Sequence, residues 1–446
     1  MTKSLISAKL KALMKTFDKI WIFLLPLVLP LYVVRFRIGP IPTTALEIFV
    51  LATFVVWLVG KWFAGKLVET QDFASLRQNP SLRRWALPIA AWLIVTLIAV
   101  FIAPDKWAAL GHWRAFMFEP ILVFVMLMDL LFFVETPSEG VSTTNKITPS
   151  GVSTRDAMSY GMATVCILMG AYAIYQFFTG FGIPDPWGAV PGRRSTGIFG
   201  FPNGLSLFMA PFGIACFIQW IKAVYAGEGW KPRLMFLAGW ALSLAALMTA
   251  KSMGGIVAFG IGAILVLLMN KRTRIVGIVI CVLGLVASSL IGYRIFTTRI
   301  HLDSLDESLY MTKAWSSMVR VTIWKESWQL IKAHPLLGSG LRSYQTAVAP
   351  FHQAKWMEIY PHPHNIIMML SIETGLLGLL AFIWLVVTWV RAVRSTRYEV
   401  LGTTDLSRWF WLIPLIVILA HGMVDMPYFK NDLAMQFWIL AALASL

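Results

Sequence analysis

A succession of long apolar runs constrains what this chain can fold into more than any other feature of its sequence. Several runs reach the ~20 residues that an α-helix needs to cross the ~30 Å hydrocarbon core of a bilayer. Of the 446 residues, 58% are hydrophobic and only 13% are charged, whereas about 25% of the residues of a typical soluble domain are charged. The sequence therefore predicts an all-α polytopic membrane protein.

The hydropathy pattern predicts about twelve transmembrane helices. The first follows a basic N-terminus, but it is long, contains prolines and lacks a small-residue cleavage site. We interpret it as a retained helix rather than a signal peptide. All three cysteines fall within the expected spans, so no disulfide framework is implied. The expected spans are roughly 17–35, 43–60, 84–103, 114–134, 157–180, 203–223, 233–250, 253–270, 274–297, 366–391, 409–424 and 430–446.

The distribution of basic residues predicts the orientation of these spans, because cytoplasmic loops are enriched in Lys and Arg. With the N-terminus inside, the short outward loops are poor in both residues. The formal net charge of +16 is then partly a consequence of topology, and no nucleic-acid partner is needed to explain it. The cytoplasmic cations are Lys3, Lys9, Lys11, Lys15, Lys61, Lys66, Arg77, Arg83, Arg84, Lys271, Arg272, Arg274, Arg391, Arg394 and Arg397.

Two outward segments, roughly 181–202 and 298–363, carry more polar and basic residues than the other outward loops. The second is the longest extramembrane stretch. It divides the chain into an N-terminal membrane bundle of about nine spans (1–297), a large periplasmic loop (298–363) and about three C-terminal membrane helices (364–446). The Ser/Thr/Gly-rich stretch 136–155 is typical of a flexible cytoplasmic loop.

Within the large loop, apolar residues at helical spacing predict an amphipathic helix from about Met318 to Ala333. Val321, Trp324, Trp328 and Ile331 share its expected apolar face. A helix of this kind either lies in the headgroup plane, which would hold Arg320 at the level of lipid phosphates, or packs as a lid over the bundle. The two interpretations are compatible.

The stretch "YPHPHNIIMML", which starts at Tyr360, places two histidines before a long apolar run. Asn365 is expected to cap the helix that begins at Ile366. His364 then sits beside the positive end of the helix dipole, which favours a neutral imidazole able to accept a proton from a hydroxyl. The alternative is a loop histidine satisfied by backbone and water. His362, between two prolines, is better suited to an orienting or structural role, and two histidines with no nearby Cys and few acidic neighbours predict no metal site.

The run that follows, "HNIIMMLSIETGLLGLL", separates His364-Asn365 from Gly375 and Gly378. A continuous helix over 366–391 would be ~39 Å long at ~1.5 Å per residue, which exceeds the hydrocarbon core. It must therefore project outward or bend near Gly375, and the glycines are expected at close-packing or bending positions.

The spacing His-Asn-x9-Gly-x-x-Gly, after a large outward loop, resembles the lipopolysaccharide O-antigen ligase family within the O-antigen ligase/polymerase superfamily. Two further stretches agree: "RRSTGIFGFPNG" resembles the family's Arg-x-x-Gly…Pro-Asn segment, and "RVTIWKESWQLIKAHPLLGSGLRSY" its Arg…Trp…His-Pro-Leu-x-Gly-x-Gly segment. The likeness covers about 190–380 well. It implies a fold similar to the GT-C glycosyltransferases. The superfamily's Ser-Arg-Gly stands here as "AKSMGG", where Lys251 is the nearest replacement for the missing arginine.

The resemblance implies a diphosphate-binding role for Arg194 and Arg320, with Arg193 and Arg342 as weaker candidates. Arginine suits this task because its planar fork makes charge-assisted, bidentate hydrogen bonds to phosphate oxygens; the alternative is a surface arginine near lipid headgroups. Asp425, on the last outward loop, either orients the catalytic histidine or a cation, or caps the final helix. Asn203 in the Pro-Asn segment is expected to support or cap a helix.

The resemblance implies an inner-membrane enzyme that moves O-antigen polysaccharide from undecaprenyl diphosphate to a lipid A-core sugar hydroxyl at the periplasmic face. His364 would assist an inverting transfer, with no cofactor and no metal. The expected partners are the lipid-linked donor, the lipid A-core acceptor and membrane lipids, and we expect a monomer. The alternatives are an O-antigen polymerase with the same donor and a transporter or flippase. The outward clustering of Arg and His disfavours transport, which usually places charges near the bilayer midplane.

Overall fold

The computed structural model describes residues 17–39, 41–67, 79–135, 154–284, 313–395 and 408–445. Several features expected from the sequence lie outside the described residues. These are the basic residues 1–16, Arg77, almost all of the loop 136–155, the second half of the span 274–297, the first residues of the large loop up to 312, and Arg397.

The described chain is helical apart from one short hairpin, so the prediction of an all-α polytopic membrane protein is confirmed. Helical residues 17–28 come first, and helix Arg274–Gly284 follows α10. The remaining elements are η1 (Leu29–Val33), β1 (Arg35–Ile38), β2 (Ile41–Thr44), α2 (Ala45–Leu67), α4 (Pro80–Ile102), α5 (Lys106–Trp113), η2 (Arg114–Phe118), α6 (Glu119–Glu135), α7 (Thr154–Thr179), α8 (Pro202–Tyr225), α9 (Trp230–Thr249), α10 (Met253–Met269), α12 (Lys313–Ala333), α13 (Tyr344–Val348), η4 (Ala349–Phe351), α14 (Ile366–Ser395), η5 (Arg408–Leu412), α15 (Ile413–Gly422) and α16 (Asn431–Ala444).

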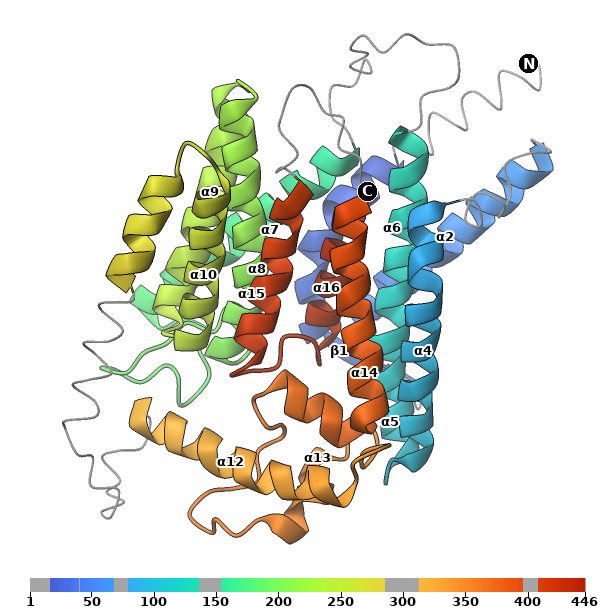
Figure 1. Ribbon diagram of the computed structural model, residues 1–446, viewed down its shortest axis with the longest axis vertical. Coiled ribbons are helices and arrows are strands. Elements are labelled where there is room, and N and C mark those ends of the chain that lie inside the picture. Colours follow the sequence, from blue (N-terminus) through green and yellow to red (C-terminus); the bar gives the residue numbers. More distant parts are fainter. Residues whose placement is uncertain are drawn as a thin grey trace.

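Long helices run side by side in a bundle, and α12 lies across one end of it (Figure 1). We call this the α12 end. In the described part of the chain, six helices are long and apolar enough to cross a membrane, and α10, Arg274–Gly284 and Trp409–Gly422 are shorter apolar helices. Large apolar side chains such as Leu87 and Phe178 are 70% and 76% exposed. Exposed apolar faces of this kind are expected where lipid, not water, surrounds a helix. The six spans are Ala45–Trp62, Pro80–Ile102, Arg155–Thr179, Pro202–Tyr225, Trp230–Thr249 and Ile366–Arg394.

Helices from the two ends of the chain form one core. α14 packs against α4, α16 against α6, and α15 against α8 and α10, while α7 and α8 both pack against α9. Every residue of α16 is buried, and α8 is nearly as enclosed. Because α16 sits inside the bundle, the loop that leads into it is held firmly at the α12 end.

A second, smaller core lies under α12. Val319, Ile323 and Leu330 of α12 pack against α13, against the first turns of α14 and against Met426. The expected apolar face was therefore partly wrong: Val321 and Trp328 are 49% and 55% exposed on the other side of the helix. The helix carries apolar residues on two sides, and the side that packs anchors Arg320 beside the loop before α16.

The hairpin of β1 and β2 was not predicted. Its strands pair antiparallel, with Arg35 opposite Thr44 and Ile38 opposite Ile41. The turn "RIGPIP" contains Gly39, whose φ of 59° lies in the left-handed region that glycine tolerates. The hairpin leads directly into α2, where Thr44, just before the helix, and Glu47, in its first turn, cap each other reciprocally.

The bend expected near Gly375 is present, and the loop that follows α12 fills it. In a continuous helix the Ile372 carbonyl would accept the Leu376 N–H. Instead, Ile372 accepts the Ser339 N–H at 2.7 Å, and the Leu376 N–H donates to the Pro335 carbonyl at 2.9 Å. The loop therefore replaces the backbone hydrogen bonds that the kink breaks.

Two glycines make this close approach possible. Gly375 has φ 64° and ψ −167°, a conformation nearly exclusive to glycine, and a Cβ on it would lie 2.2 Å from the Leu336 carbonyl oxygen. A Cβ on Gly338 would lie 2.5 Å from the Ile372 carbonyl oxygen. The Gly-x-Gly of the large loop and the glycine after His-Asn-x9 thus dock into each other.

Candidate functional site

His364 is positioned by the start of α14. Asn365 caps the helix as predicted, since its Oδ1 accepts the Met368 N–H at 3.1 Å, and its Nδ2 also donates to the Met423 carbonyl at 2.9 Å. On the other side, Trp324 Nε1 donates to the Pro363 carbonyl at 2.9 Å. His364 itself has a left-handed φ of 50°, which is uncommon for a residue with a Cβ. The loop is thus tied to α12 and to the segment that follows α15.

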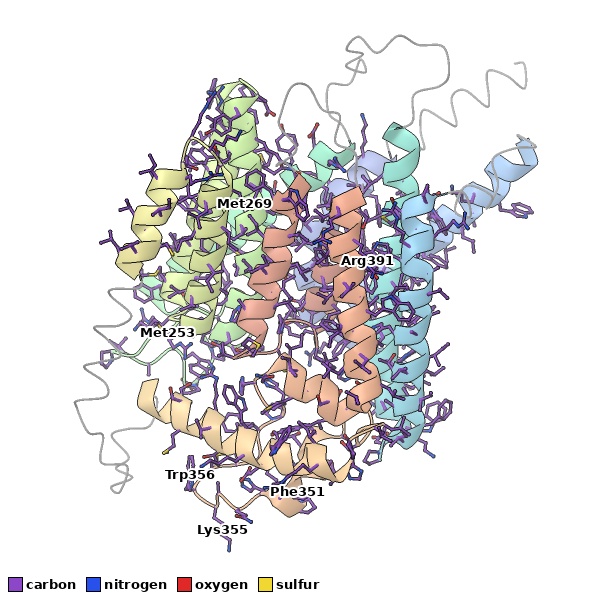
Figure 2. The ribbon with its side chains drawn as sticks, in the orientation of Figure 1. Met253, Met269, Phe351, Lys355, Trp356 and Arg391 are labelled. Atoms are coloured by element: carbon purple, nitrogen blue, oxygen red, sulfur yellow. The ribbon has the colours of Figure 1, made fainter. Side chains whose placement is uncertain are left out.

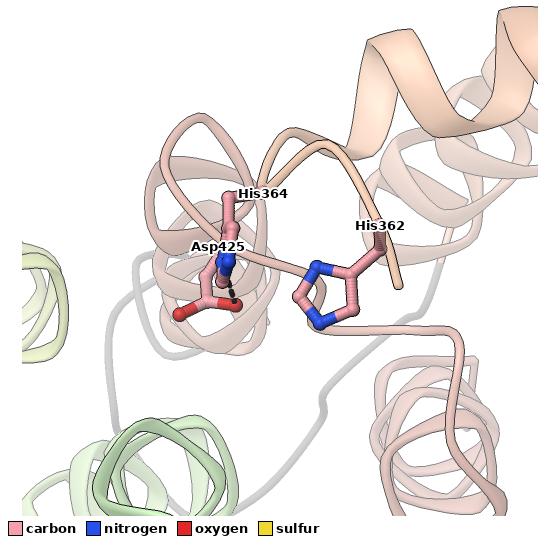
Figure 3. Close-up of side chains that lie close together, drawn as sticks. All are labelled: His362, His364 and Asp425. Atoms are coloured by element: carbon pink, nitrogen blue, oxygen red, sulfur yellow. Dashed lines mark hydrogen bonds and ion pairs between the residues drawn. The ribbon is translucent and has the colours of Figure 1, made fainter. Parts of the chain in front are cut away.

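Asp425 faces His364 from the loop between α15 and α16, as Figure 3 shows. His364 Nδ1 lies 3.4 Å from Asp425 Oδ1, which also accepts the Met426 N–H at 2.9 Å. Asp425 is only 3% exposed. Burial alone would raise the pKa of Asp425, but the hydrogen bond from His364 and the neighbouring imidazoles hold it below its ordinary value. Asp425 is therefore a carboxylate at neutral pH, able to orient an imidazole and to stabilise its protonated form.

Asn203 connects this pair to an arginine. Its Nδ2 donates to Asp425 Oδ2 at 2.7 Å, and its Oδ1 accepts from Arg194 Nη2 at 3.3 Å. Arg194 also donates from Nε to the Ala250 carbonyl at 2.8 Å and lies over the Trp187 ring at 5.0 Å. A hydrogen-bonded chain therefore runs from Arg194 through Asn203 and Asp425 to His364.

The charged form of Arg194 is disfavoured by its surroundings. Burial and the like charge of Arg320 lower its pKa, and Asp425 opposes that effect. A guanidinium that is desolvated and placed near a second cation gains from an anionic ligand. The site therefore favours a group with more than one negative charge.

The loop that presents Arg194 is held by Gln176 of α7. Gln176 Oε1 accepts the N–H groups of Thr196 and Gly197 at 3.1 and 2.8 Å, and its Nε2 donates to the Gly197 carbonyl at 3.0 Å. The Ser195 N–H donates to the Thr249 carbonyl at 3.1 Å. Both contacts fix the backbone on either side of Ser195 and hence the direction of Arg194.

Arg320 reaches the same place from α12. Its Nε donates to the Val424 carbonyl at 3.2 Å, directly before Asp425, and its Nη1 donates to the Ser316 carbonyl at 3.3 Å. Segments from four regions of the chain thus meet at the α12 end of the bundle. Arg194 is connected to Asp425 through Asn203, and Arg320 binds the carbonyl of the residue before Asp425.

The other candidate cations lie elsewhere. Arg193 donates from Nη1 to the carbonyls of Phe177 and Phe178, at 3.0 and 2.9 Å, and so caps the C-terminus of α7. Lys251 is exposed, with its Nζ 5.9 Å from the Phe177 ring centroid. Arg342 is also exposed and binds Glu373 through its backbone N–H. Among the candidate cations, Arg194 and Arg320 are thus the ones that the structure brings to Asp425.

His362 lies against His364, with ring centroids 4.3 Å apart. Burial, with help from His364 and Arg320, lowers the pKa of His362 to about 4, although Asp425 acts in the opposite direction. Its buried Nδ1 has no hydrogen-bond partner among the described residues. His362 is therefore a neutral imidazole with a free ring nitrogen at the site.

Glu373 is a supporting residue that the sequence reasoning missed. It is fully buried two residues before Gly375, where its Oε1 accepts the Arg342 N–H at 2.8 Å. An acidic residue inside the apolar run "SIETGLLGLL" was the available signal, since charges within such runs usually have a specific partner. Trp324 is expected on an apolar face, and nothing in the sequence indicates that its indole N–H donates to the Pro363 carbonyl.

Residues 238–383, about a third of the chain, match the O-antigen ligase family. The family match includes Arg320, the loop that fills the α14 kink, and His364-Asn365 with the glycines beyond them. Arg194, Asn203 and Asp425 lie outside it, so their connection to the family's histidine comes from the fold.

Several Rickettsia proteins provisionally named polysaccharide ligases are distant relatives of this chain. The Rickettsia conorii protein is 24% identical over 203 residues, which are 44% of this chain and 48% of that protein. The Rickettsia felis protein is 22% identical over 284 residues, 62% of this chain and 63% of that protein. The Rickettsia bellii protein is 27% identical over 200 residues, 40% and 48% of the two chains. The chain thus spans between about half and just under two thirds of these relatives.

Proposed function

We propose that this chain is an enzyme of the O-antigen ligase type, which moves a polysaccharide from undecaprenyl diphosphate to a sugar hydroxyl of a lipid A-core acceptor. The observation that carries the proposal is the chain of hydrogen bonds from Arg194 through Asn203 and Asp425 to His364. It links a cation suited to a diphosphate with an imidazole suited to a hydroxyl. Transfer of a sugar from a diphosphate to a hydroxyl needs the cation and the imidazole in one place.

In this mechanism a ring nitrogen of His364 accepts the proton of the acceptor hydroxyl as its oxygen attacks the anomeric carbon. The new carbon–oxygen bond forms on the face opposite the leaving group, so the configuration inverts. Asp425, ionised and hydrogen-bonded to His364 Nδ1, fixes the ring and stabilises the imidazolium that forms. General-base assistance of this kind typically contributes about 10²–10⁴ in rate.

The bond from the anomeric carbon to the diphosphate oxygen breaks with its electron pair on the diphosphate. Arg194 and Arg320 bind the diphosphate and stabilise the charge that builds on it. Arg194 is partly buried, so its interaction with a phosphate is stronger than that of an arginine in water. This leaving group needs no nucleotide, and the reaction as proposed uses no metal or other cofactor.

The finer architecture belongs to the same proposal: about twelve spans, a GT-C-like arrangement, and a monomer in the bacterial inner membrane with its site at the periplasmic face. Each expected span coincides with helical residues in the described part of the chain. Both substrates carry lipid tails, so the site would open sideways to the bilayer between helices.

The test uses purified full-length protein in lipid nanodiscs, with undecaprenyl-diphosphate glycan and lipid A-core. We expect joined product from the wild type, in chelator as well as without it, and a loss of about 10²-fold or more for His364→Ala. His334→Ala, at an exposed histidine after α12, serves as the matched control. Undiminished product from His364→Ala would exclude the mechanism. Extension of a second lipid-linked chain instead of lipid A-core would identify a polymerase, and movement of lipid without product a flippase.

A further inference from the structure

His362, His364 and Asp425 form a compact set of metal-binding donors. The three side chains come from two loops, before α14 and before α16, and each offers one ligand atom within 4.8 Å of the other two. Figure 3 shows both imidazoles turned toward the carboxylate. The sequence predicted no ligand set here because two histidines alone are insufficient; the fold supplies the third donor from 61 residues further along the chain.

All three donors are available to a cation. His362 Nδ1 is buried and has no hydrogen-bond partner among the described residues, so this ring nitrogen is not engaged by another group. Donor groups of Asn203 and Met426 already orient the two carboxylate oxygens of Asp425. Such outer hydrogen bonds hold metal-binding carboxylates in place. His364 is fixed by the cap that follows it.

The donor types select the kind of ion. Two imidazoles and one carboxylate suit Zn²⁺ and related transition metals, whereas Mg²⁺ prefers oxygen ligands and retained water. Ligands of a tetrahedral Zn²⁺ site lie about 3.3 Å from one another. His364 Nδ1 and Asp425 Oδ1 are already 3.4 Å apart, and only the His362 ring has to approach. Arg194 and Arg320 oppose a cation, so they weaken the site without removing its donors.

We propose that His362, His364 and Asp425 bind one Zn²⁺-class ion, and that the bound ion inhibits glycan transfer. The inhibitory part rests on the proposed function, because it follows from His364 being the base. The bound ion uses a lone pair of His364 and neutralises the charge of Asp425. The imidazole then cannot accept the proton of the acceptor hydroxyl, and Asp425 cannot stabilise an imidazolium. Binding displaces any proton held on the ligating nitrogens. Removal of the ion leaves these nitrogens able to accept a proton again.

The binding test needs no substrate. Full-length protein in detergent is titrated with Co²⁺, whose visible absorption is intense in a tetrahedral site, and then with Zn²⁺ as competitor. We expect one Co²⁺ per chain, displaced by Zn²⁺, and an affinity lowered by about tenfold or more in His362→Gln. His334→Gln, at an exposed histidine outside the set, should bind as the wild type does. No saturable cobalt spectrum, or an equal one in His362→Gln, would overturn the site.

The activity test is separate. Zn²⁺ should inhibit transfer by the wild type, chelator should restore it, and His362→Gln should need about tenfold more Zn²⁺ for half inhibition, relative to its own uninhibited rate. Zinc that binds without inhibiting would overturn the inhibitory role. Cobalt binding in a protein that transfers no glycan would refute the proposed function but support the metal site. Glycan transfer without cobalt binding would refute the metal site but support the proposed function.

Discussion

Arg193 and Arg194 are neighbours in the sequence, yet their guanidinium groups bind different parts of the molecule. Arg193 donates to carbonyls at the end of α7, whereas Arg194 donates to Asn203 and through it reaches Asp425. We expect Arg194→Gln to lower glycan transfer by about 10²–10³, the loss typical for removal of one donor that stabilises transition-state charge. The measurement is the initial rate at saturating acceptor.

Arg193→Gln is the matched control for that substitution. It removes charge-assisted hydrogen bonds worth about 1.5–3 kcal/mol each and should lower the melting temperature in detergent, with a much smaller loss of transfer per folded molecule. A rate loss as large as that of Arg194→Gln, at unchanged melting temperature, would show that the two roles are assigned the wrong way round.

At the scale of single residues, the sequence predicted interactions between neighbours in the chain and missed interactions between residues far apart in it. Asn365 and His364 were recognisable because a cap and a dipole depend on a few consecutive residues. The contact of Asn203 with Asp425 joins residues 222 positions apart, and no spacing rule expresses it. Asp425 itself was a candidate, but whether it oriented a histidine or capped a helix was decided by the tertiary fold.

The kink of α14 and the loop that fills it act as one element. Gly375→Ala would bring a methyl group to 2.2 Å from the Leu336 carbonyl oxygen, in a backbone conformation that alanine avoids. We expect a stability loss of about 1–3 kcal/mol or more from the strained backbone alone. Displacement of the loop would also remove the partners of Ile372 and Leu376. The measurement is thermal unfolding in detergent, followed by intrinsic tryptophan fluorescence.

Gly260→Ala is the matched control, because a Cβ on this α10 residue meets nothing within 4 Å. It should be neutral or slightly stabilising, since alanine is favoured over glycine within a helix by about 1 kcal/mol. Equal melting temperatures for Gly375→Ala and Gly260→Ala would contradict the docking of the loop into the kink.

The elements themselves were largely predictable, with two instructive exceptions. Apolar runs of span length have few alternatives to a helix in a membrane, so each expected span is helical over most of its described residues. The packed face of α12 was partly wrong because Val319, Ile323 and Leu330 compete with Val321 and Trp328 as an apolar side. The short hairpin of β1 and β2 was missed because each strand has only four residues, too few for the alternation of Arg and apolar residues in β1 to stand out, and β2 contains a proline.

At the scale of the whole molecule, the candidate site depends on all its segments lying on one side of the membrane. Lys355 lies at the α12 end, while α10 runs from Met253 near that end to Met269 at the opposite one, as the side-chain view in Figure 2 shows. Lys271 follows α10 directly, and both lysines are exposed. We therefore expect Lys355→Cys to react with a membrane-impermeant maleimide in intact spheroplasts, and Lys271→Cys to react only after the membrane is permeabilised.

Both cysteine variants are made in a background carrying Cys281→Ala, because Cys166 and Cys216 are buried and Cys281 is partly exposed. The background protein should remain unlabelled on both sides of the membrane. Labelling of Lys271→Cys but not of Lys355→Cys in intact spheroplasts would place His364 and Arg194 in the cytoplasm. A transfer reaction between lipid-linked substrates at the periplasmic face would then be impossible for this chain.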